Sequence, residues 1–203
     1  MKKSAFTMLE LVFVIVVIGI LAAVFIPRFE RDNAGEAAYQ IARHIRLAQH
    51  HALVEDKFST TDSDWWKGMW AITFRTTKNC YAVYNNQDYA TGGTQADQNE
   101  SAVDPLTRKR LYSDSNCNEN TATTDDVLLW KKFGVDSLTL TNCGTNNQIL
   151  FDHLGRPYGS VGNLLVNNNC VITLGTKDGH SAEITVYKET GFVKVTKIDA
   201  TDL

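Results

Sequence analysis

The most strongly apolar stretch of the chain lies close to its first residue. From Phe6 to Ile26 nearly every position is apolar, and about 21 residues of helix at ~1.5 Å rise are long enough to cross the hydrocarbon layer of a membrane. Glu10 is the one acid in this run. A carboxylate there costs roughly 2.5–3.5 kcal/mol if it reaches the middle of the membrane. Glu10 therefore either reaches water near the interface or needs a partner charge.

The flanks of this run favour an anchor that stays with the chain. A secretory signal peptide ends its apolar run with a small-residue cleavage site, whereas residues 24–29 are bulky here. Lys2 and Lys3 lie on the N-terminal side. The positive-inside tendency then places the N-terminus in the cytoplasm and the residues beyond about 30 outside.

Beyond Pro27 the apolar positions recur every three or four residues, which predicts an amphipathic helix. Most of them are small, so whatever packs on them must approach closely: Ala34, Ala37, Ala38, Ile41, Ala42, Ile45, Ala48 and Ala52. We expect one continuous helix from about Thr7 to about Val54, half in the membrane and half laid on a globular domain.

The rest of the chain carries strand patterns. Residues 70–74 and 80–84 alternate and are rich in aromatic side chains, which predicts an antiparallel hairpin. From about 85 to 126 the chain is polar, and we expect an insertion with a short strand around Lys109–Tyr112. Further strands are expected at Val127–Phe133, Leu138–Leu140, Gln148–Phe151, Cys170–Leu174, Ala182–Tyr187 and Phe192–Ile198. The predicted fold class is α+β, a long N-terminal helix packed on a C-terminal antiparallel sheet domain.

Charge and cysteine content narrow the class of protein. The chain has 20 Lys+Arg and 23 Asp+Glu, and without Lys2, Lys3 and Glu10 the balance is 18 to 22, which argues against a polyanion as partner. All four cysteines lie beyond the apolar run and none is in a C-x-x-C pair, so two disulfides are favoured over zinc or a redox site. Three pairings are possible. Local loop closure favours Cys80 with Cys117 and Cys143 with Cys170.

The sequence Ser4-Ala5-Phe6-Thr7-Met8-Leu9-Glu10 resembles the class III signal of type IV pilins and pseudopilins. The resemblance implies that a prepilin peptidase cuts between Ala5 and Phe6 and methylates Phe6. It also implies that Glu10 pairs with the amino group of Phe6 on a neighbouring subunit during filament assembly. The family usually has Gly where this chain has Ala5. Gly19 and Pro27 fall where pilins commonly carry residues that let the helix flex.

A second resemblance covers most of residues 35–198, loosely. The order of Gly68-Met69-Trp70, then Phe151–Pro157, then the paired segments Val171–Leu174 and Glu183–Val195 is similar to the heads of minor pseudopilin H of type II secretion and of FimT-like minor pilins. The implied organisation is a leader (1–5), a transmembrane and assembly helix (6–27), the amphipathic half of the stem helix (28–58) and an antiparallel β head (59–203) with a polar insertion at about 85–126.

These resemblances imply a structural subunit without enzymatic activity. The implied protein is a minor pilin or pseudopilin of a type II secretion pseudopilus or a related type IV filament. It would be held in the bacterial inner membrane with its head in the periplasm, and then be assembled into a periplasmic or surface filament. Its partners would be other pilin subunits, the prepilin peptidase and an inner-membrane assembly platform. Two alternatives stay open: a minor pilin with a direct ligand such as DNA or a host surface, and a membrane-anchored binding domain that never polymerises.

Other candidate sites are weaker. The chain has five histidines, and none of them are spaced as a metal-binding pair: His44, His50, His51, His153 and His180. No familiar catalytic motif is present, so catalysis is not expected. Asp114, Asn116, Asn118 and Asp125 have the spacing of calcium ligands, but Glu119 stands where such loops need Gly. No other cofactor is expected.

Three further features have both a structural and a functional interpretation. Asn99-Glu100-Ser101, with the upstream Asp97, is an N-glycosylation acceptor pattern. Trp65, Trp66 and Trp70 favour core or edge packing over a ligand platform. Lys188, Lys194 and Lys197 could form a small basic stripe, but the acids Asp199 and Asp202 follow, which argues against DNA as a ligand.

Overall fold

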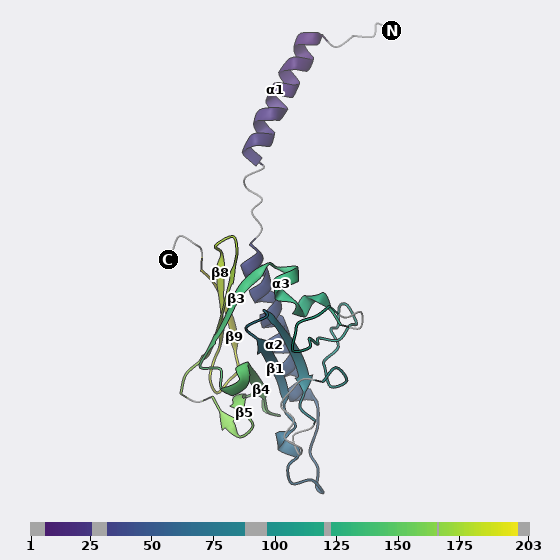
Figure 1. Cartoon of the computed structure of the whole chain (residues 1–203), viewed down its shortest axis with the longest axis vertical. Coiled ribbons are helices and arrows are strands. Elements are labelled where there is room, and N and C mark those ends of the chain that lie inside the picture. The colour runs from purple at the N-terminus through teal and green to yellow at the C-terminus, as the bar shows by residue number, and fades with distance from the viewer. Residues whose placement is uncertain (1–6, 26–31, 88–96, 120–122, 166, 199–203) are drawn as a thin grey trace. The chain divides into compact units, whose positions relative to one another are not determined.

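The computed structural model describes residues 7–25, 32–87, 97–119, 123–165 and 167–198 (Figure 1). The chain divides into two compact units, Met1–Asp32 and Asn33–Leu203. We call them the N-terminal unit and the head and describe each by itself.

The N-terminal unit contains one helix, α1 (Met8–Phe25), of 18 residues. The expected single helix from Thr7 to Val54 is instead found as α1 and a second helix that begins at Asn33, with residues 26–31 outside the described part and Asp32 not helical. The described apolar helix is thus shorter than the expected one. By length, hydropathy and charge, none of the helices in the described part of the chain qualifies as a membrane span.

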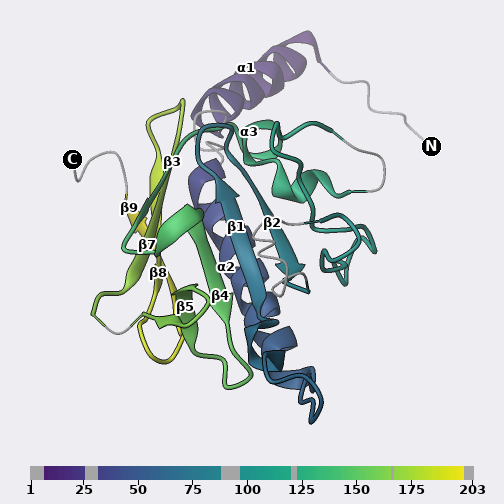
Figure 2. The same cartoon turned by 60° about the horizontal axis from the view of Figure 1, so that its bottom comes forward.

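The head is organised around α2 (Asn33–Val54). The predicted small-residue stripe is confirmed, because every one of its eight members is buried. The helix packs against strands of two separate antiparallel sheets (Figure 2). Alanines on this face let both sheets approach the helix axis closely, which explains why the stripe carries so few large side chains.

The first sheet has the strand order β2-β1-β4-β5-β6. Its strands are β1 (Trp70–Arg75), β2 (Cys80–Asn85), β4 (Gln148–Phe151), β5 (Pro157–Ser160) and β6 (Asn163–Leu164). The predicted hairpin is confirmed, with Ile72 opposite Val83. Both faces of β1 and β2 are buried, one on α2 and the other under a smaller cluster around Tyr84 and Leu150, so these strands do not show a simple inside-outside alternation.

The second sheet has the strand order β3-β7-β8-β9. Its strands are β3 (Val135–Thr141), β7 (Cys170–Thr176), β8 (Ser181–Val186) and β9 (Val193–Ile198). Buried and half-buried positions alternate along β7 and β8, as expected for a sheet with one face on a helix and the other toward solvent. The predicted hairpin between the last two strands is confirmed, with Ile184 opposite Val195.

One strand prediction is wrong here, and two short strands were missed. Residues 127–133 do not form a strand: the 3-10 helix η4 (Asp125–Val127) is followed by the short helix α3 (Leu129–Lys132). Thr124 caps this segment by accepting a hydrogen bond from the Asp126 amide at 3.3 Å. A short apolar run fits either a buried strand or a helical turn, so its pattern alone could not separate them. Strands β5 and β6 were not predicted, because they have only four and two residues and their sequences show no alternating pattern of apolar residues. Two further 3-10 turns lie in the described part of the chain: η2 (Trp65–Lys67) and η5 (Thr145–Asn147).

The polar insertion is built onto the free edge of β2. The Val83 amide donates to the Leu111 carbonyl at 2.9 Å, and the Ala102 amide donates to the Val83 carbonyl at 2.9 Å. The strand expected at Lys109–Tyr112 is reduced to isolated bridges of Arg110 with Val103 and Thr123. The insertion therefore pairs the backbone groups of an edge strand that would otherwise be open to another chain.

Candidate functional site

Glu10 lies in the first turn of α1 and caps its own helix. Thr7 precedes the helix, and its hydroxyl accepts a hydrogen bond from the Glu10 amide at 3.3 Å. In return the Glu10 carboxylate accepts from the Thr7 amide and hydroxyl, both at 3.4 Å. This reciprocal pattern is a capping box, a local use for the acid that sequence reasoning did not consider.

The side chains of α1 are exposed around the whole helix. From residue 7 to residue 22 every described position is exposed, including Leu9 at 81% and Phe13 at 68%. Nothing lies within 4 Å of a Cβ built on Gly19. A helix that is apolar on every side needs a nonpolar environment to cover it. Ala5, Phe6 and Pro27 lie outside the described residues.

The predicted disulfide pairing is confirmed. Cys80 pairs with Cys117 across 37 residues and Cys143 with Cys170 across 27 residues. The first bond ties the start of β2 to the polar insertion, and the second joins the segment after β3 to the start of β7. Each therefore fastens a loop to a strand rather than one sheet to the other.

The candidate calcium ligands are engaged with protein donors. The Asp114 carboxylate accepts hydrogen bonds from the amides of Asn116 at 3.0 Å and Asn118 at 2.9 Å. The Asp125 carboxylate lies 2.9 Å from the Lys131 ammonium. Within the described residues no group of three or more His, Cys, Asp or Glu is placed to hold a metal ion.

The candidate acceptor Asn99 is exposed on a turn. Its backbone amide donates to Asp97 at 2.8 Å. The Ser101 hydroxyl, which completes the acceptor pattern, is buried and donates to the Asp97 carbonyl at 2.7 Å. In this turn the asparagine is therefore exposed to solvent, whereas the serine hydroxyl is bonded within the turn.

Strands β8 and β9, with the turn between them, carry both basic and acidic side chains. Lys188 and Lys194 are exposed, whereas the Lys197 side chain lies outside the described residues. Lys194 pairs with Thr185 across β8 and β9, and the Thr185 hydroxyl donates to Glu183 at 3.3 Å. An acid thus sits beside the proposed basic stripe.

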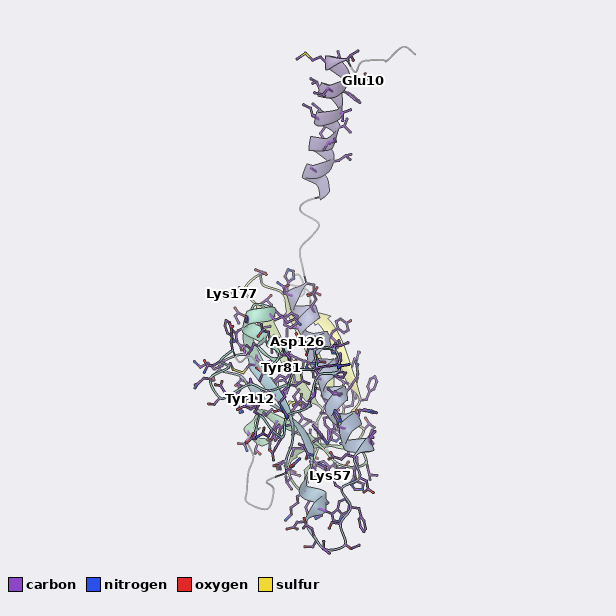
Figure 3. The ribbon with its side chains drawn as sticks, turned by 90° about the vertical axis from the view of Figure 1, so that its right-hand side faces the viewer. Glu10, Lys57, Tyr81, Tyr112, Asp126 and Lys177 are labelled. Carbon is purple, nitrogen blue, oxygen red and sulfur yellow. A yellow bond between two sulfur atoms is a disulfide. The ribbon has the colours of Figure 1, made fainter. Side chains whose placement is uncertain are left out.

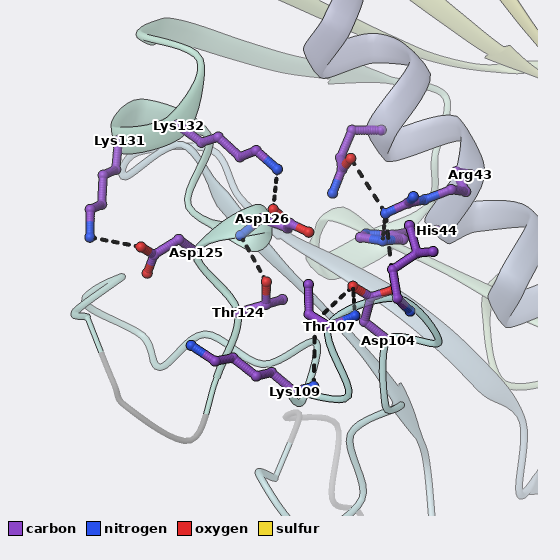
Figure 4. Close-up of polar contacts among 12 residues, drawn as sticks. Arg43, His44, Asp104, Thr107, Lys109, Thr124, Asp125, Asp126, Lys131 and Lys132 are labelled. Carbon is purple, nitrogen blue, oxygen red and sulfur yellow. Dashed lines mark hydrogen bonds and ion pairs between the residues drawn. The ribbon is translucent and has the colours of Figure 1, made fainter.

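A buried polar chain that sequence reasoning missed runs from His44 on α2 through Tyr81 to Asp126 in η4. Figure 4 shows His44 and Asp126 at its two ends, with Arg43 beside His44. His44 is 1% exposed, its Nδ1 lies 2.7 Å from the Tyr81 hydroxyl, and its Nε2 lies 3.2 Å from the Arg43 guanidinium. Arginine can only donate, so Nε2 must accept and the proton sits on Nδ1, which donates to Tyr81. Tyr81 in turn donates to the Asp126 carbonyl at 3.3 Å.

This environment disfavours the charged imidazole. Burial, and then the neighbouring Arg43 charge, lower the pKa of His44 to about 4. Burial also raises the pKa of Tyr81 well above its usual range. Residue 44 falls on the same face as Ile41 and Ala48, so the helical periodicity already carried a signal that this histidine is buried.

The three tryptophans of residues 65–70 surround a groove beyond the C-terminal end of α2. Trp70 stacks on His51 with ring centroids 4.5 Å apart, and its indole N–H donates to Glu55. Trp65 lies between Phe58 and His153, with ring centroids 5.5 Å away on each side. Trp70 is packed as predicted, but Trp66 keeps 39% of its surface exposed.

Two adjoining hollows make up this tryptophan groove, which we define by Glu55, Lys57, Trp65, Trp66, Trp70 and Asn85. They share Glu55, Lys57, Trp65 and Gly68. The wider hollow, of about 320 Å³, is also lined by Asp62, Asn85 and Gln87. The narrower one is also lined by Trp66, Trp70, Phe151 and Asp152.

No protein-family model matches the chain, and neither a curated protein nor a solved structure shows significant similarity to it.

Proposed function

We propose that the chain is a minor pilin or pseudopilin, a structural subunit of a type II secretion pseudopilus or a related type IV filament. The observation that carries the proposal is α1, an apolar helix exposed on every described side, with a single acid in its first turn. Such a helix needs either lipid or the helices of other subunits around it. A filament core supplies the second of these, and the membrane supplies the first before assembly.

The capping box suggests how Glu10 takes part in assembly. Among the described residues, its carboxylate accepts neutral hydrogen bonds from Thr7, at 3.4 Å. Cleavage before Phe6 would create a charged amino group, and the amino group of a neighbouring subunit could replace these contacts. A charge-assisted hydrogen bond is roughly twice as strong as a neutral one. Docking would also neutralise a charge that lipid disfavours.

The head fits a location outside the cytoplasm. Both disulfides lie in it, and disulfides persist in oxidising compartments such as the bacterial periplasm. We therefore propose an inner-membrane precursor with a cytoplasmic N-terminus and a periplasmic head. Prepilin peptidase, an assembly platform and other pilin subunits are its proposed partners, and no enzymatic role is proposed.

The test replaces Glu10 while keeping its size. Glu10→Gln removes the charge, and we expect normal membrane insertion and cleavage but loss of incorporation into filaments. Glu36→Gln is the matched control, because Glu36 is an exposed acid in the first turn of α2. N-terminal sequencing of the mature chain should begin at Phe6. Incorporation of the Glu10 variant at the level of the Glu36 variant would contradict the proposal, as would a mature chain that still begins at Met1.

One observation favours the alternative of a minor pilin with a direct ligand. The tryptophan groove is concave and keeps aromatic surface open to solvent. Filament assembly does not require such a groove, so a ligand-binding role can exist beside the structural one.

A further inference from the structure

The tryptophan groove gathers aromatic surface that core packing alone does not require. Three of the chain's four tryptophans line it. Trp66 is 39% exposed and Phe58, which packs on Trp65, is 65% exposed. A cluster of this kind would lower its free energy by burying these faces, so leaving them open points to a surface that another molecule covers.

The polar side chains of the groove are already held in place. The Lys57 ammonium donates to the Asn85 side-chain carbonyl at 2.5 Å and to the Gly68 carbonyl. The Asn85 amide in turn donates to the Glu55 carboxylate at 3.3 Å. Asn85 is 4% exposed, so its orientation is locked by packing as well as by hydrogen bonds. Fixed donors and acceptors lower the entropy cost of binding a polar ligand.

We propose that the tryptophan groove binds a neutral sugar, plain or N-acetylated, as one or two pyranose rings of a glycan. A pyranose has an apolar face of C–H groups that stacks on an aromatic ring, and a rim of hydroxyls that both donate and accept. Carboxylate and amide side chains match neighbouring hydroxyl pairs. Glu55, Asp62, Asn85 and Gln87 supply such groups beside Trp65. The volume of about 320 Å³ lies at the small end of ligand sites.

The charges of the groove select among sugars. Glu55 and Asp62 are both acidic, and the one cation, Lys57, is 3.6 Å from Glu55 and already hydrogen-bonded. An additional carboxylate on the ligand would therefore meet net negative charge. Acidic sugars should bind more weakly than their neutral counterparts.

A proline-rich peptide is the other occupant an aromatic groove can take. Such peptides rely on tryptophan N–H groups to bind their carbonyls. Here the Trp70 N–H is committed to Glu55, and most of the wider hollow is lined by charged and amide side chains. The observations favour the sugar.

The groove lies at the C-terminal end of α2 within the head. It begins where α2 ends. Helix α2 has 22 residues, so about 33 Å of helix separates Asn33, the first residue of the head, from the groove. Lys57 and Lys177 mark opposite ends of the head (Figure 3). The proposal stands on the groove alone and does not depend on filament assembly.

The test is saturation-transfer NMR on the full chain in a zwitterionic detergent, because maltoside detergents carry sugar headgroups. The probes are the methyl glycosides of glucose, galactose and mannose, together with N-acetylglucosamine and glucuronic acid. We expect saturation of the C–H protons of at least one neutral or N-acetylated probe, and a weaker effect for glucuronic acid than for methyl glucoside.

Two variants locate the site. Trp65→Ala removes the tryptophan that lines the wider hollow and should weaken the responding probe about fivefold or more, and Gln87→Ala, at the exposed rim, should weaken it measurably while leaving the fold intact. Trp130→Ala is the matched control, because Trp130 is 44% exposed on α3, away from the groove, and it should change nothing. Absence of saturation in every neutral probe would overturn the proposal. Equal losses in the Trp65 and Trp130 variants, or displacement of the sugar by a polyproline peptide with higher affinity, would also overturn it.

Discussion

The Nδ1 atom of His44 lies 2.7 Å from the hydroxyl oxygen of Tyr81, and this contact joins helix α2 to strand β2 in the interior of the head. Arg43 on one side and the Asp126 carbonyl on the other extend it into a chain of four groups. His44 and Tyr81 are each both donor and acceptor here, so a change at either one alters the hydrogen bonding of the other.

Acid should destabilise the head through His44. The pKa of His44 is about 4 in the folded chain, against 6.5 for the free side chain, because burial and Arg43 disfavour the charged ring. Between these values the unfolded chain binds more protons, so the free energy of unfolding falls as the pH drops. The loss from this group should be about 2 kcal/mol between pH 7.5 and 5.

Urea unfolding at both pH values measures this loss. In the His44→Gln variant this residue cannot titrate. Between pH 7.5 and 5 the variant should therefore lose about 2 kcal/mol less unfolding free energy than the unmodified chain. The variant corrects for the carboxylates that titrate nearby. Parallel pH profiles for the two chains would show that His44 does not control the acid sensitivity.

Removing the Tyr81 hydroxyl should cost more than removing a comparable one. Tyr81→Phe leaves both the His44 Nδ1–H and the Asp126 carbonyl without this partner in a buried site. We expect a loss of about 2–3 kcal/mol in unfolding free energy. Tyr84→Phe, on the same buried strand but outside this chain of groups, is the control and should lose about 1 kcal/mol. Similar losses for both variants would mean that the hydrogen bonds of Tyr81 to His44 and Asp126 do not contribute more to stability than an ordinary buried hydroxyl.

The disulfide Cys80–Cys117 should hold the polar insertion on β2. Replacing both cysteines by serine should lower the unfolding free energy by about 3–4 kcal/mol, given a loop of 37 residues. Hydrogen exchange should also speed up at the amides of Val83 and Ala102, which pair β2 with the insertion. The double replacement of Cys143 and Cys170 is the control, since it should cost a similar free energy without selectively exposing these amides. Equal exchange in the two variants would argue against the anchoring role.

Gly144 should tolerate no side chain, for two separable reasons. Its φ of +89° favours glycine, and a Cβ there would lie 2.2 Å from the Cα of Gly159. Gly179 has a φ of +83° but nothing within 4 Å of a Cβ. Gly179→Ala should therefore cost about 1 kcal/mol, the conformational part alone, and Gly144→Ala at least about 2 kcal/mol more. Denaturant midpoints at an unchanged m-value measure both, and a difference below 1 kcal/mol would show that the backbones move apart easily.

Some features could be predicted because they depend on local pattern. The stripe from Ala34 to Ala52, both hairpins and strand β4 follow from hydrophobic periodicity and turn residues. The disulfide pairing follows from local loop closure. The helix at residues 129–132 could not be predicted, because a short apolar run fits either a strand or a helical turn.

The sequence by itself determined most of the elements, the apolar N-terminal helix with its single acid, and the α+β class, because periodicity and turn chemistry act over a few neighbouring residues. The tertiary structure decided which groups from distant segments meet. The His44–Tyr81 contact joins residues 37 apart, and the tryptophan groove joins the end of α2 to residues beyond β2 and β4. Such meetings depend on how two sheets pack on one helix, and residue spacing along a chain carries no information about that packing.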